Sequence, residues 1–224
     1  MHLQPAHTKV SPRTAAASPR SERAPVESNA EVRVQFADHF DPDRSKFEGF
    51  IRDGYEAAYA ARIERFMPRL MSVLTPAGDI IAVCGLRDPR HGPLYLEHYL
   101  DQPVEAVLER AAGRPVSRRS LTEVGNLAIG RPGFARFLIA ALTEHLHEIG
   151  QEWAVFTAVP ALRNAFSRLG VDLVSLGAAR ISAIPARDRA QWGRYYEQKP
   201  LVMAASVEQS RVALGRSGFQ PIIL

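Results

Sequence analysis

The sequence has almost no cysteine and no long apolar run, and both absences narrow the class of protein. Cys84 is the only cysteine among 224 residues, so no disulfide forms within the chain, and we expect a reducing compartment, the cytoplasm. No apolar run approaches the roughly 20 residues that span a bilayer. The rest of the composition, 46% hydrophobic and 23% charged, is typical of a soluble globular protein.

Aromatic residues are missing from the first 30 positions, which are rich in Ala, Ser, Pro and Arg. Such a segment cannot bury enough apolar surface to offset its ordering entropy, so we expect residues 1–30 to be a disordered basic tail. A transit peptide is the weaker alternative. Because this tail carries half of the net charge of +4, the basic composition does not indicate a nucleic-acid partner, and we expect none.

The apolar pattern predicts a single domain over residues 31–214, followed by a short C-terminal tail at 215–224. Its first element is a long amphipathic helix over residues 47–66, whose apolar stripe is expected to face the core rather than a membrane. The predicted strands lie at 70–74, 80–86, 94–100, 121–127, 153–157, 173–176 and 201–206, and the later helices at 103–108, 134–149, 160–169 and 185–196. This order favours an α/β (α+β) domain with a mixed sheet flanked by helices.

The most informative stretch runs from Leu121 to Ala135, where a strand enters a glycine-containing loop and a helix follows directly. The first amides of a helix have no partner inside it, so with the helix dipole they can bind a pyrophosphate. Gly133 and Ala135 are small enough to let phosphates approach, and Arg131 and Arg136 add positive charge. Ordinary turn chemistry is the alternative explanation of the loop.

Glu123 stands in a mainly apolar strand, two residues before Gly125, so both residues belong to one face of the strand. A carboxylate in this position beside a phosphate loop is a candidate general base, and a buried structural glutamate is the alternative. A glycine inside a strand indicates a bulge or the close approach of a ligand or backbone.

Several motifs together resemble known acyltransferases. The strand, the Gly-x-Ala loop and the helix resemble the acyl-coenzyme A site of the GNAT acyltransferases. Residues 59–202 are similar to the thermostable hemolysin family, whose members share this fold. The likeness rests on Phe66-Met67-Pro68, Leu94-Tyr95-Leu96-Glu97, Tyr99-Leu100-Asp101, Glu123-Val124-Gly125-Asn126-Leu127-Ala128, Trp153-Ala154-Val155-Phe156-Thr157, Leu162-Arg163-Asn164-Ala165-Phe166 and Trp192-Gly193-Arg194-Tyr195-Tyr196. A fainter likeness to acyl-homoserine-lactone synthases places Glu123 at the Glu, and Asn126 at the Arg, of their Glu-Leu-Ser-Arg strand.

The resemblance implies a GNAT-like fold with a mixed, mostly antiparallel sheet. It also implies transfer of an acyl group from a coenzyme A or acyl-carrier-protein thioester to a small-molecule amine. The expected catalytic residues are Glu123, as the base, and Asn126, whose backbone helps to polarise the thioester. The donor, including its phosphopantetheine arm, is expected to contact Leu127, Ile129, Arg131, Gly133, Phe134, Ala135 and Arg136. The expected substrate-binding residues are Arg87, Glu97, Phe156, Thr157 and Trp192.

Two positions depart from the GNAT pattern. Gly130 begins the loop where those enzymes commonly have Gln or Arg, and Phe166 stands where many have a proton-donating Tyr. A thiolate leaves readily, so such an acid is helpful but not essential. A membrane-active, hemolysin-like protein and a non-catalytic acyl-coenzyme A-binding module therefore stay open as alternatives. The histidines show no zinc spacing, and we expect no metal.

Overall fold

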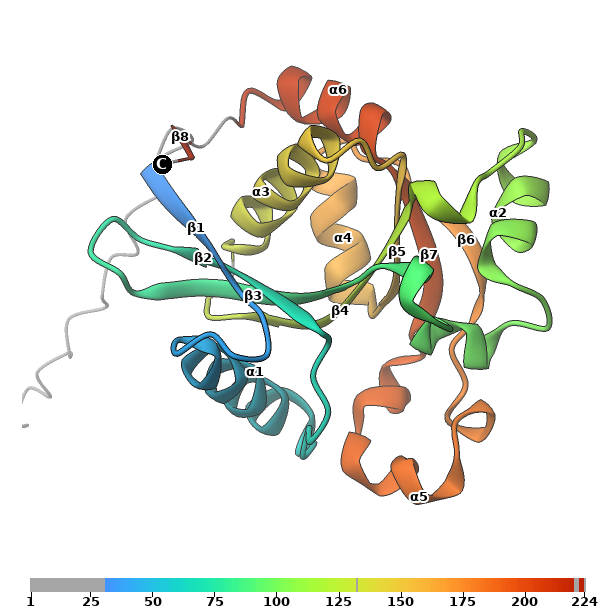
Figure 1. The fold of residues 1–224 in the computed structure, drawn as a ribbon, viewed down its shortest axis with the longest axis horizontal. Helices are drawn as coiled ribbons and strands as arrows, with labels where there is room; N and C mark the ends of the chain where they lie inside the picture. The colour runs from blue at the N-terminus through green and yellow to red at the C-terminus, as the bar shows by residue number, and fades with distance from the viewer. Residues whose placement is uncertain (1–30, 132, 220–221, 224) are drawn as a thin grey trace, which may run out of the picture.

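The computed structural model describes residues 31–131, 133–219 and 222–223. The tail predicted over residues 1–30 lies outside them. Within the described residues one eight-stranded sheet has the order β6-β7-β5-β4-β3-β2-β1-β8 (Figure 1). Among these strands only β4–β5 and β1–β8 pair in parallel, so the predicted mixed, mostly antiparallel sheet is confirmed.

The strands and helices have the following bounds. The strands are β1 (Glu31–Ala37), β2 (Arg69–Leu74), β3 (Ile80–Arg87), β4 (Leu121–Ile129), β5 (Trp153–Ala158), β6 (Val174–Ala178), β7 (Leu201–Ser206) and β8 (Ile222–Ile223). The helices are α1 (Arg44–Tyr59), α2 (Val104–Ala112), α3 (Ala135–Glu148), α4 (Pro160–Arg168), α5 (Ala186–Arg189) and α6 (Val207–Ser217).

Helices cover both faces of the sheet, with α1 on one side and α3, α4 and α6 on the other (Figure 1). On the α1 side, Phe47 and Ile51 are buried in one cluster with Val83 of β3. On the opposite side, the apolar stripe predicted for α3 is buried, and Phe137 and Leu138 belong to the largest apolar cluster. Burial of these two helix stripes fixes how α1 and α3 lie against β3 and β4.

The predicted hairpin of β2 and β3 and the alternation from β4 to β7 are confirmed, but the predicted helix over residues 47–66 is too long. Helix α1 ends at Tyr59, because Ala60 adopts a left-handed backbone conformation with φ of 51°. Beyond it, the N–H of Arg62 donates to the carbonyl of Gln191 at 2.7 Å, and Ile63 is buried. A distant backbone partner therefore replaces the next helical turn.

Two further segment predictions are wrong for a similar reason. The run at 94–100 is not a strand: Tyr95–Tyr99 form a 3-10 helix whose first amides bind the Glu123 carboxylate. The helix predicted at 185–196 breaks into short pieces at Gly193, whose φ is 47°. A Cβ atom at Gly193 would lie 2.3 Å from the Tyr59 carbonyl oxygen, so this backbone packs tightly against the end of α1.

The two ends of the described chain hold elements that the apolar pattern did not predict. Strand β1 pairs with β2, and its beginning pairs with β8. Helix α6 continues to Ser217, so the boundary expected at residue 214 falls inside it. Ser206 caps α6 by accepting a hydrogen bond from the Gln209 N–H at 3.4 Å.

Candidate active site

The parallel strands β4 and β5 separate after only four residue pairs. Their pairing runs from Leu121 with Trp153 to Val124 with Phe156, whereas β4 continues to Ile129 beside β3. Beyond Val124, the ladder of β4 is described only with β3, and the end of β5 pairs with β7. We call this opening between β4 and β5 the seam. Figure 1 shows the two halves of the sheet diverging there.

A β-bulge lies in β4 at the start of the seam. Val83 of β3 pairs with Ala128 and Gly85 pairs with Gly125, so Cys84 alone faces the two residues Asn126 and Leu127. Asn126 has a φ of 47°, a conformation that Asn adopts more readily than most residues. The bulge predicted from Gly125 is therefore confirmed, one residue further along the strand.

Gly85 of β3 and Gly125 of β4 are paired, and the Met67 side chain packs on the surface that their missing side chains leave open. A Cβ atom at Gly85 would lie 2.6 Å from the Cβ atom of Met67, and one at Gly125 would lie 2.5 Å from its Cε atom. The close approach at Gly125 is thus made by a side chain and not by the ligand or backbone that the sequence suggested. The backbone N–H of Met67 donates to the Asn126 Oδ1 atom at 2.8 Å, which holds the segment 60–67 against β4.

A cavity of about 220 Å³ lies beside the seam. Strand residues form its floor, and its walls come from α1, the segment 60–67, the 3-10 helix Tyr95–Tyr99 and the 3-10 helix Ala190–Trp192. Its lining residues are Tyr55, Ile63, Arg65, Phe66, Met67, Arg87, Tyr95, Leu96, Tyr99, Glu123, Val124, Gly125, Asn126, Leu127, Phe156, Thr157, Gln191 and Trp192. Of these lining residues, only Arg65, Arg87 and Glu123 belong to the acidic and basic types Asp, Glu, Lys, Arg and His.

A larger hollow of about 730 Å³ lies between β1, α3 and α6, away from Glu123 and the seam. Its walls are formed by residues such as Phe36, Ala140 and Leu214, and none of the predicted site residues lines it. We therefore take the smaller cavity as the candidate site.

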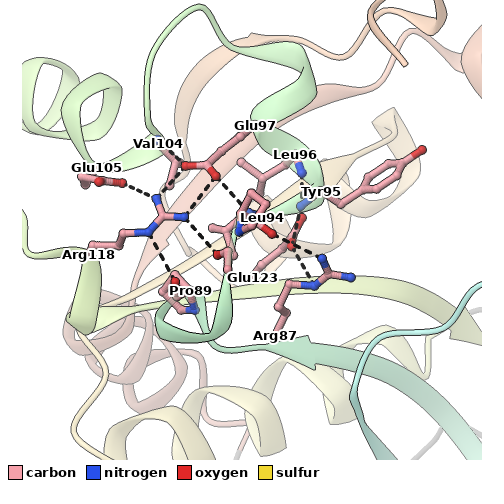
Figure 2. Close-up of polar contacts among 12 residues, drawn as sticks. Arg87, Pro89, Leu94, Tyr95, Leu96, Glu97, Val104, Glu105, Arg118 and Glu123 are labelled. Carbon is pink, nitrogen blue, oxygen red and sulfur yellow. Dashed lines mark hydrogen bonds and ion pairs between the residues drawn. The ribbon is translucent and has the colours of Figure 1, made fainter. Parts of the chain in front are cut away.

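Glu123 is 2% exposed and holds the 3-10 helix Tyr95–Tyr99 in place (Figure 2). Its Oε2 atom accepts the Tyr95 N–H at 2.9 Å, and its Oε1 atom accepts the Leu96 N–H at 2.8 Å. The Nε atom of Arg87 lies 3.6 Å from Oε2. Burial raises the pKa of Glu123 above its ordinary value, and the two amides and Arg87 only partly oppose this effect.

Glu97 lies close by in the 3-10 helix, but its surroundings shift its pKa in the opposite direction from that of Glu123. Burial alone would raise its pKa, but hydrogen bonds from Arg118 and from the amides of Leu94 and Val104 hold the pKa below its ordinary value. Arg118 also bonds to Glu105 at 2.7 Å, so one guanidinium bridges two carboxylates (Figure 2). Glu97 does not line the cavity, and its contacts tie the 3-10 helix to α2 and to the residues before β4.

All six tyrosines of the chain gather with Trp192 around the cavity. The Tyr99 and Tyr196 hydroxyls lie 2.5 Å apart, and the Tyr195 hydroxyl lies 3.2 Å from the Thr157 Oγ1 atom. Burial raises the pKa of every one of them, to about 12 for Tyr195. The set consists of Tyr55, Tyr59, Tyr95, Tyr99, Tyr195 and Tyr196. These rings are neutral at physiological pH, and Tyr55, Tyr95 and Tyr99 among them contribute a largely apolar wall to the cavity.

The predicted donor loop follows β4 and leads into α3. Gly133 adopts a φ of 93°, and Arg131 is exposed. The guanidinium of Arg136 lies 4.7 Å from the ring centre of Phe219, and the ring of Phe134 packs edge-on against Phe137. Pro132 lies outside the described residues, so the path of the loop is given only on either side of it.

The structure brings half of the predicted site residues to one cavity. Those that line it are Glu123, Asn126, Leu127, Arg87, Phe156, Thr157 and Trp192. Those that do not are Glu97, Ile129, Arg131, Gly133, Phe134, Ala135 and Arg136. Phe166, which stands where many GNAT enzymes have a Tyr, stacks on Phe156 in the core at 5.2 Å.

The sequence motifs, taken one at a time, did not single out Arg65, Met67, Tyr55 or the paired tyrosines of the 3-10 helix as site residues. A usable signal was present, since Tyr55 and Tyr59, like Tyr95 and Tyr99, are four residues apart and share a face when helical. Within the described ranges, no group of three or more His, Cys, Asp or Glu side chains is arranged to hold a metal ion. None of the helices in these ranges has the length and apolar character of a membrane span.

Comparisons with solved structures identify the fold. The N-acyl amino acid synthase FeeM from uncultured soil microbes matches at 16% identity, covering 84% of this chain and 99% of that one, with a TM-score of 0.55. The acyl-homoserine lactone synthase LasI matches at 14% identity, with coverage of 83% and 95% and a TM-score of 0.53. The coenzyme A-dependent synthase BjaI, solved with SAM and isopentyl-CoA, matches at 13% identity, with coverage of 88% and 93% and a TM-score of 0.55.

Comparisons by sequence give a narrower result. No curated protein sequence matches the chain significantly. The family model for thermostable hemolysins matches residues 37–211, from the last residue of β1 into α6, and so agrees with the likeness drawn from the motifs. This match spans well over half of the residues of the chain, and the chain therefore belongs to the thermostable hemolysin family.

Proposed function

We propose that this protein transfers an acyl group from a coenzyme A or acyl-carrier-protein thioester to a small-molecule amine. The observation that carries the proposal is the position of Glu123, a buried carboxylate in the cavity at the point where β4 and β5 part. A linear donor that enters the seam brings its thioester to this carboxylate. The solved structures with the same fold support this proposal, since their names describe acyl transfer and BjaI holds isopentyl-CoA.

The donor side of the site follows from the seam. The pantetheine arm contains amides, and the unpaired side of β4 beyond Val124 offers backbone groups to them. Beyond the end of β4 come the loop after Ile129 and the first turn of α3, where these residues would meet the pyrophosphate. Arg131 and Arg136 add positive charge there.

In the chemical step, the amine nitrogen attacks the thioester carbonyl carbon, a C–N bond forms, and the C–S bond breaks. The ammonium form of the amine gives up two protons: Glu123 accepts one, directly or through water, and the departing sulfur takes the other to leave as a thiol. The raised pKa of Glu123 makes its carboxylate a stronger base than an ordinary glutamate. The cavity supplies positioning and exclusion of water.

Asn126 contributes through its backbone rather than its side chain. Its carboxamide is already used by the Met67 N–H and the Arg65 carbonyl. Its left-handed conformation turns the backbone of the bulge between Asn126 and Leu127 at the seam, where it can stabilise charge on the thioester oxygen.

The test is release of free thiol from acyl-coenzyme A and from an acylated carrier protein in the presence of a panel of amines, with mass detection of the amide. We expect product with at least one donor, and an acid-side fall in kcat/KM at a pH above the ordinary pKa of glutamate. Glu123→Gln should lower kcat/KM by about 10²- to 10⁴-fold and remove that limb.

Glu109→Gln provides the matched control, because Glu109 is exposed on α2 and lies outside the cavity. Its activity and pH profile should equal those of the unaltered chain. Tight binding of coenzyme A without thiol release from any donor would favour a non-catalytic binding module and would overturn the proposal.

A further inference from the structure

Three side chains of the acidic and basic types line the cavity. Two are guanidinium groups, from Arg65 and Arg87, and one is the carboxylate of Glu123. Arg65 already has a carboxylate partner in Asp188, so a simple amine that binds Glu123 as an ammonium ion places a second positive charge beside Arg87. A ligand that carries an ammonium and a carboxylate close together matches both signs.

Arg87 is available for such a carboxylate. Its side chain is 31% exposed, and its Nε atom is buried without a hydrogen bond among the described residues. The contact with Glu123 is long for an ion pair, at 3.6 Å, and the bond from its Nη1 atom to the Pro93 carbonyl is also long, at 3.4 Å. A planar guanidinium with spare donors is suited to binding a carboxylate through two parallel hydrogen bonds.

The size and walls of the cavity limit the ligand further. At about 220 Å³ the cavity is smaller than the roughly 300–1,000 Å³ of pockets for drug-sized ligands, so it accommodates one small molecule rather than a peptide. Facing the charged groups is the aromatic wall of Tyr95, Tyr99 and Trp192, which suits an apolar, aromatic or cationic side chain.

We propose, on the basis of the acyl transfer proposed above, that the acceptor is a free α-amino acid whose carboxylate binds Arg87 and whose amino group faces Glu123. Arg65 also lines the cavity, but Asp188 at 3.5 Å offsets its charge, so Arg87 is the group that binds the carboxylate. The product is then an N-acyl amino acid, in which the acyl carbon is bonded to the former ammonium nitrogen.

The experiment uses matched pairs that differ only in the carboxylate: tyrosine with tyramine, leucine with isopentylamine, and arginine with agmatine. Calorimetric binding to the full chain and thiol release from an acyl thioester are measured for each pair. We expect at least one amino acid to exceed its amine partner by about 10-fold or more in affinity and in kcat/KM. The arm that responds identifies the side-chain class.

Arg87→Met keeps the length of the side chain and removes its charge. It should weaken the amino acid about 10- to 100-fold more than the paired amine, which brings their ratio close to one, because the loss of charge beside Glu123 acts on both substrates alike. Arg87→Lys retains the charge without the planar fork and should fall between the two. Arg90→Met is the control, since exposed Arg90 pairs with Asp88 outside the cavity, and the ratio should not change.

Two outcomes separate the inference from the proposed function. Equal use of tyramine and tyrosine, with the other pairs equal as well, overturns the amino-acid acceptor and leaves acyl transfer standing. Carboxylate-dependent binding that needs Arg87, without thiol release from any donor, supports the ligand class and overturns the reaction. A dipeptide such as Tyr-Gly should not replace tyrosine, and its use at equal efficiency would also contradict the inference.

Discussion

The side chain of Asn126 accepts a hydrogen bond from the backbone N–H of Met67, a residue 59 positions earlier in the chain. This bond joins the bulge of β4 to the segment that follows α1, and the Nδ2 atom of Asn126 extends the contact to the Arg65 carbonyl at 3.3 Å. A single carboxamide therefore ties one wall of the cavity to β4.

Replacement of Asn126 should separate the hydrogen bond from the backbone strain. Asn126→Ala removes both bonds and keeps a side chain at positive φ, so we expect a loss of about 2–4 kcal/mol in the free energy of unfolding. Asn126→Gly removes the same bonds but is unstrained at φ of 47°, and should lose roughly 1 kcal/mol less. Urea unfolding measures both values. Two variants as stable as the unaltered chain would show that the segment 60–67 is held by other contacts.

The glycine pair under Met67 allows a second test by substitution. Gly85→Ala sets a new Cβ atom against the Met67 Cβ atom, which cannot move independently of the backbone, and should cost about 1–3 kcal/mol of stability. Gly125→Ala meets the flexible Cε end instead and should cost less, while narrowing the cavity. Gly49→Ala in α1 has no atom within 4 Å and should stabilise by about 0.5–1 kcal/mol. Thermal unfolding that ranks these three variants in another order contradicts the packing described here.

The tyrosine cluster predicts an unusual alkaline titration. Burial raises the pKa of all six tyrosines, so the folded chain should develop phenolate absorbance only above the ordinary pKa near 10. Because the folded pKa values are the higher ones, the associated stability is fully present below about pH 10 and is lost as the pH rises through them. The urea-unfolded chain serves as the control and should titrate near 10. Several tyrosines ionising at that pH in the folded chain would contradict the cluster.

The bridge that Arg118 forms between Glu97 and Glu105 predicts that stability depends on pH in the acid range. Arg118→Met leaves Glu97 with two backbone amides and no charged partner, so we expect a loss of about 1–3 kcal/mol at neutral pH. The folded pKa of Glu97 is depressed, so its contribution is present above the unfolded pKa and is lost as the pH falls through the folded value. The difference between variant and unaltered chain should therefore shrink in acid. Chemical denaturation at several pH values measures it, with Arg114→Met, whose exposed pair with Glu152 is a surface contact, as the control.

Much of the fold was predictable because its core elements carry a local apolar period. The hairpin of β2 and β3 and the buried stripe of α3 follow from spacing alone. The breaks at Ala60 and Gly193 and the 3-10 helix Tyr95–Tyr99 were not predictable in this way. Their backbone partners are residues such as Gln191 and Glu123, which lie far away in the sequence.

The residues of the candidate site also divide into those placed by local sequence and those placed by contacts with distant residues. Glu123, Asn126 and Thr157 stand on strands within recognisable motifs, and the sequence was sufficient to select them. Arg65 lies in a segment without regular secondary structure that the apolar pattern assigns to a helix, and Met67 follows directly after that predicted helix, so their approach to β4 depends on tertiary contacts. Glu97 carries the same chemistry as Glu123, and only the surroundings of the two carboxylates separate a structural role from a candidate base.

Apart from Tyr55 of α1, the walls of the cavity come from three short segments, at 60–67, 95–99 and 190–192, whereas its floor belongs to the sheet. The parts proposed to hold the donor and the charged groups of the acceptor are therefore continuous with the core, and the part proposed to hold the acceptor's side chain is added to it from outside. Members of one family can then exchange these segments, and with them the acceptor, without rebuilding the strands. We expect acceptor preference in this family to vary with the sequence of the three segments, while the donor stays the same.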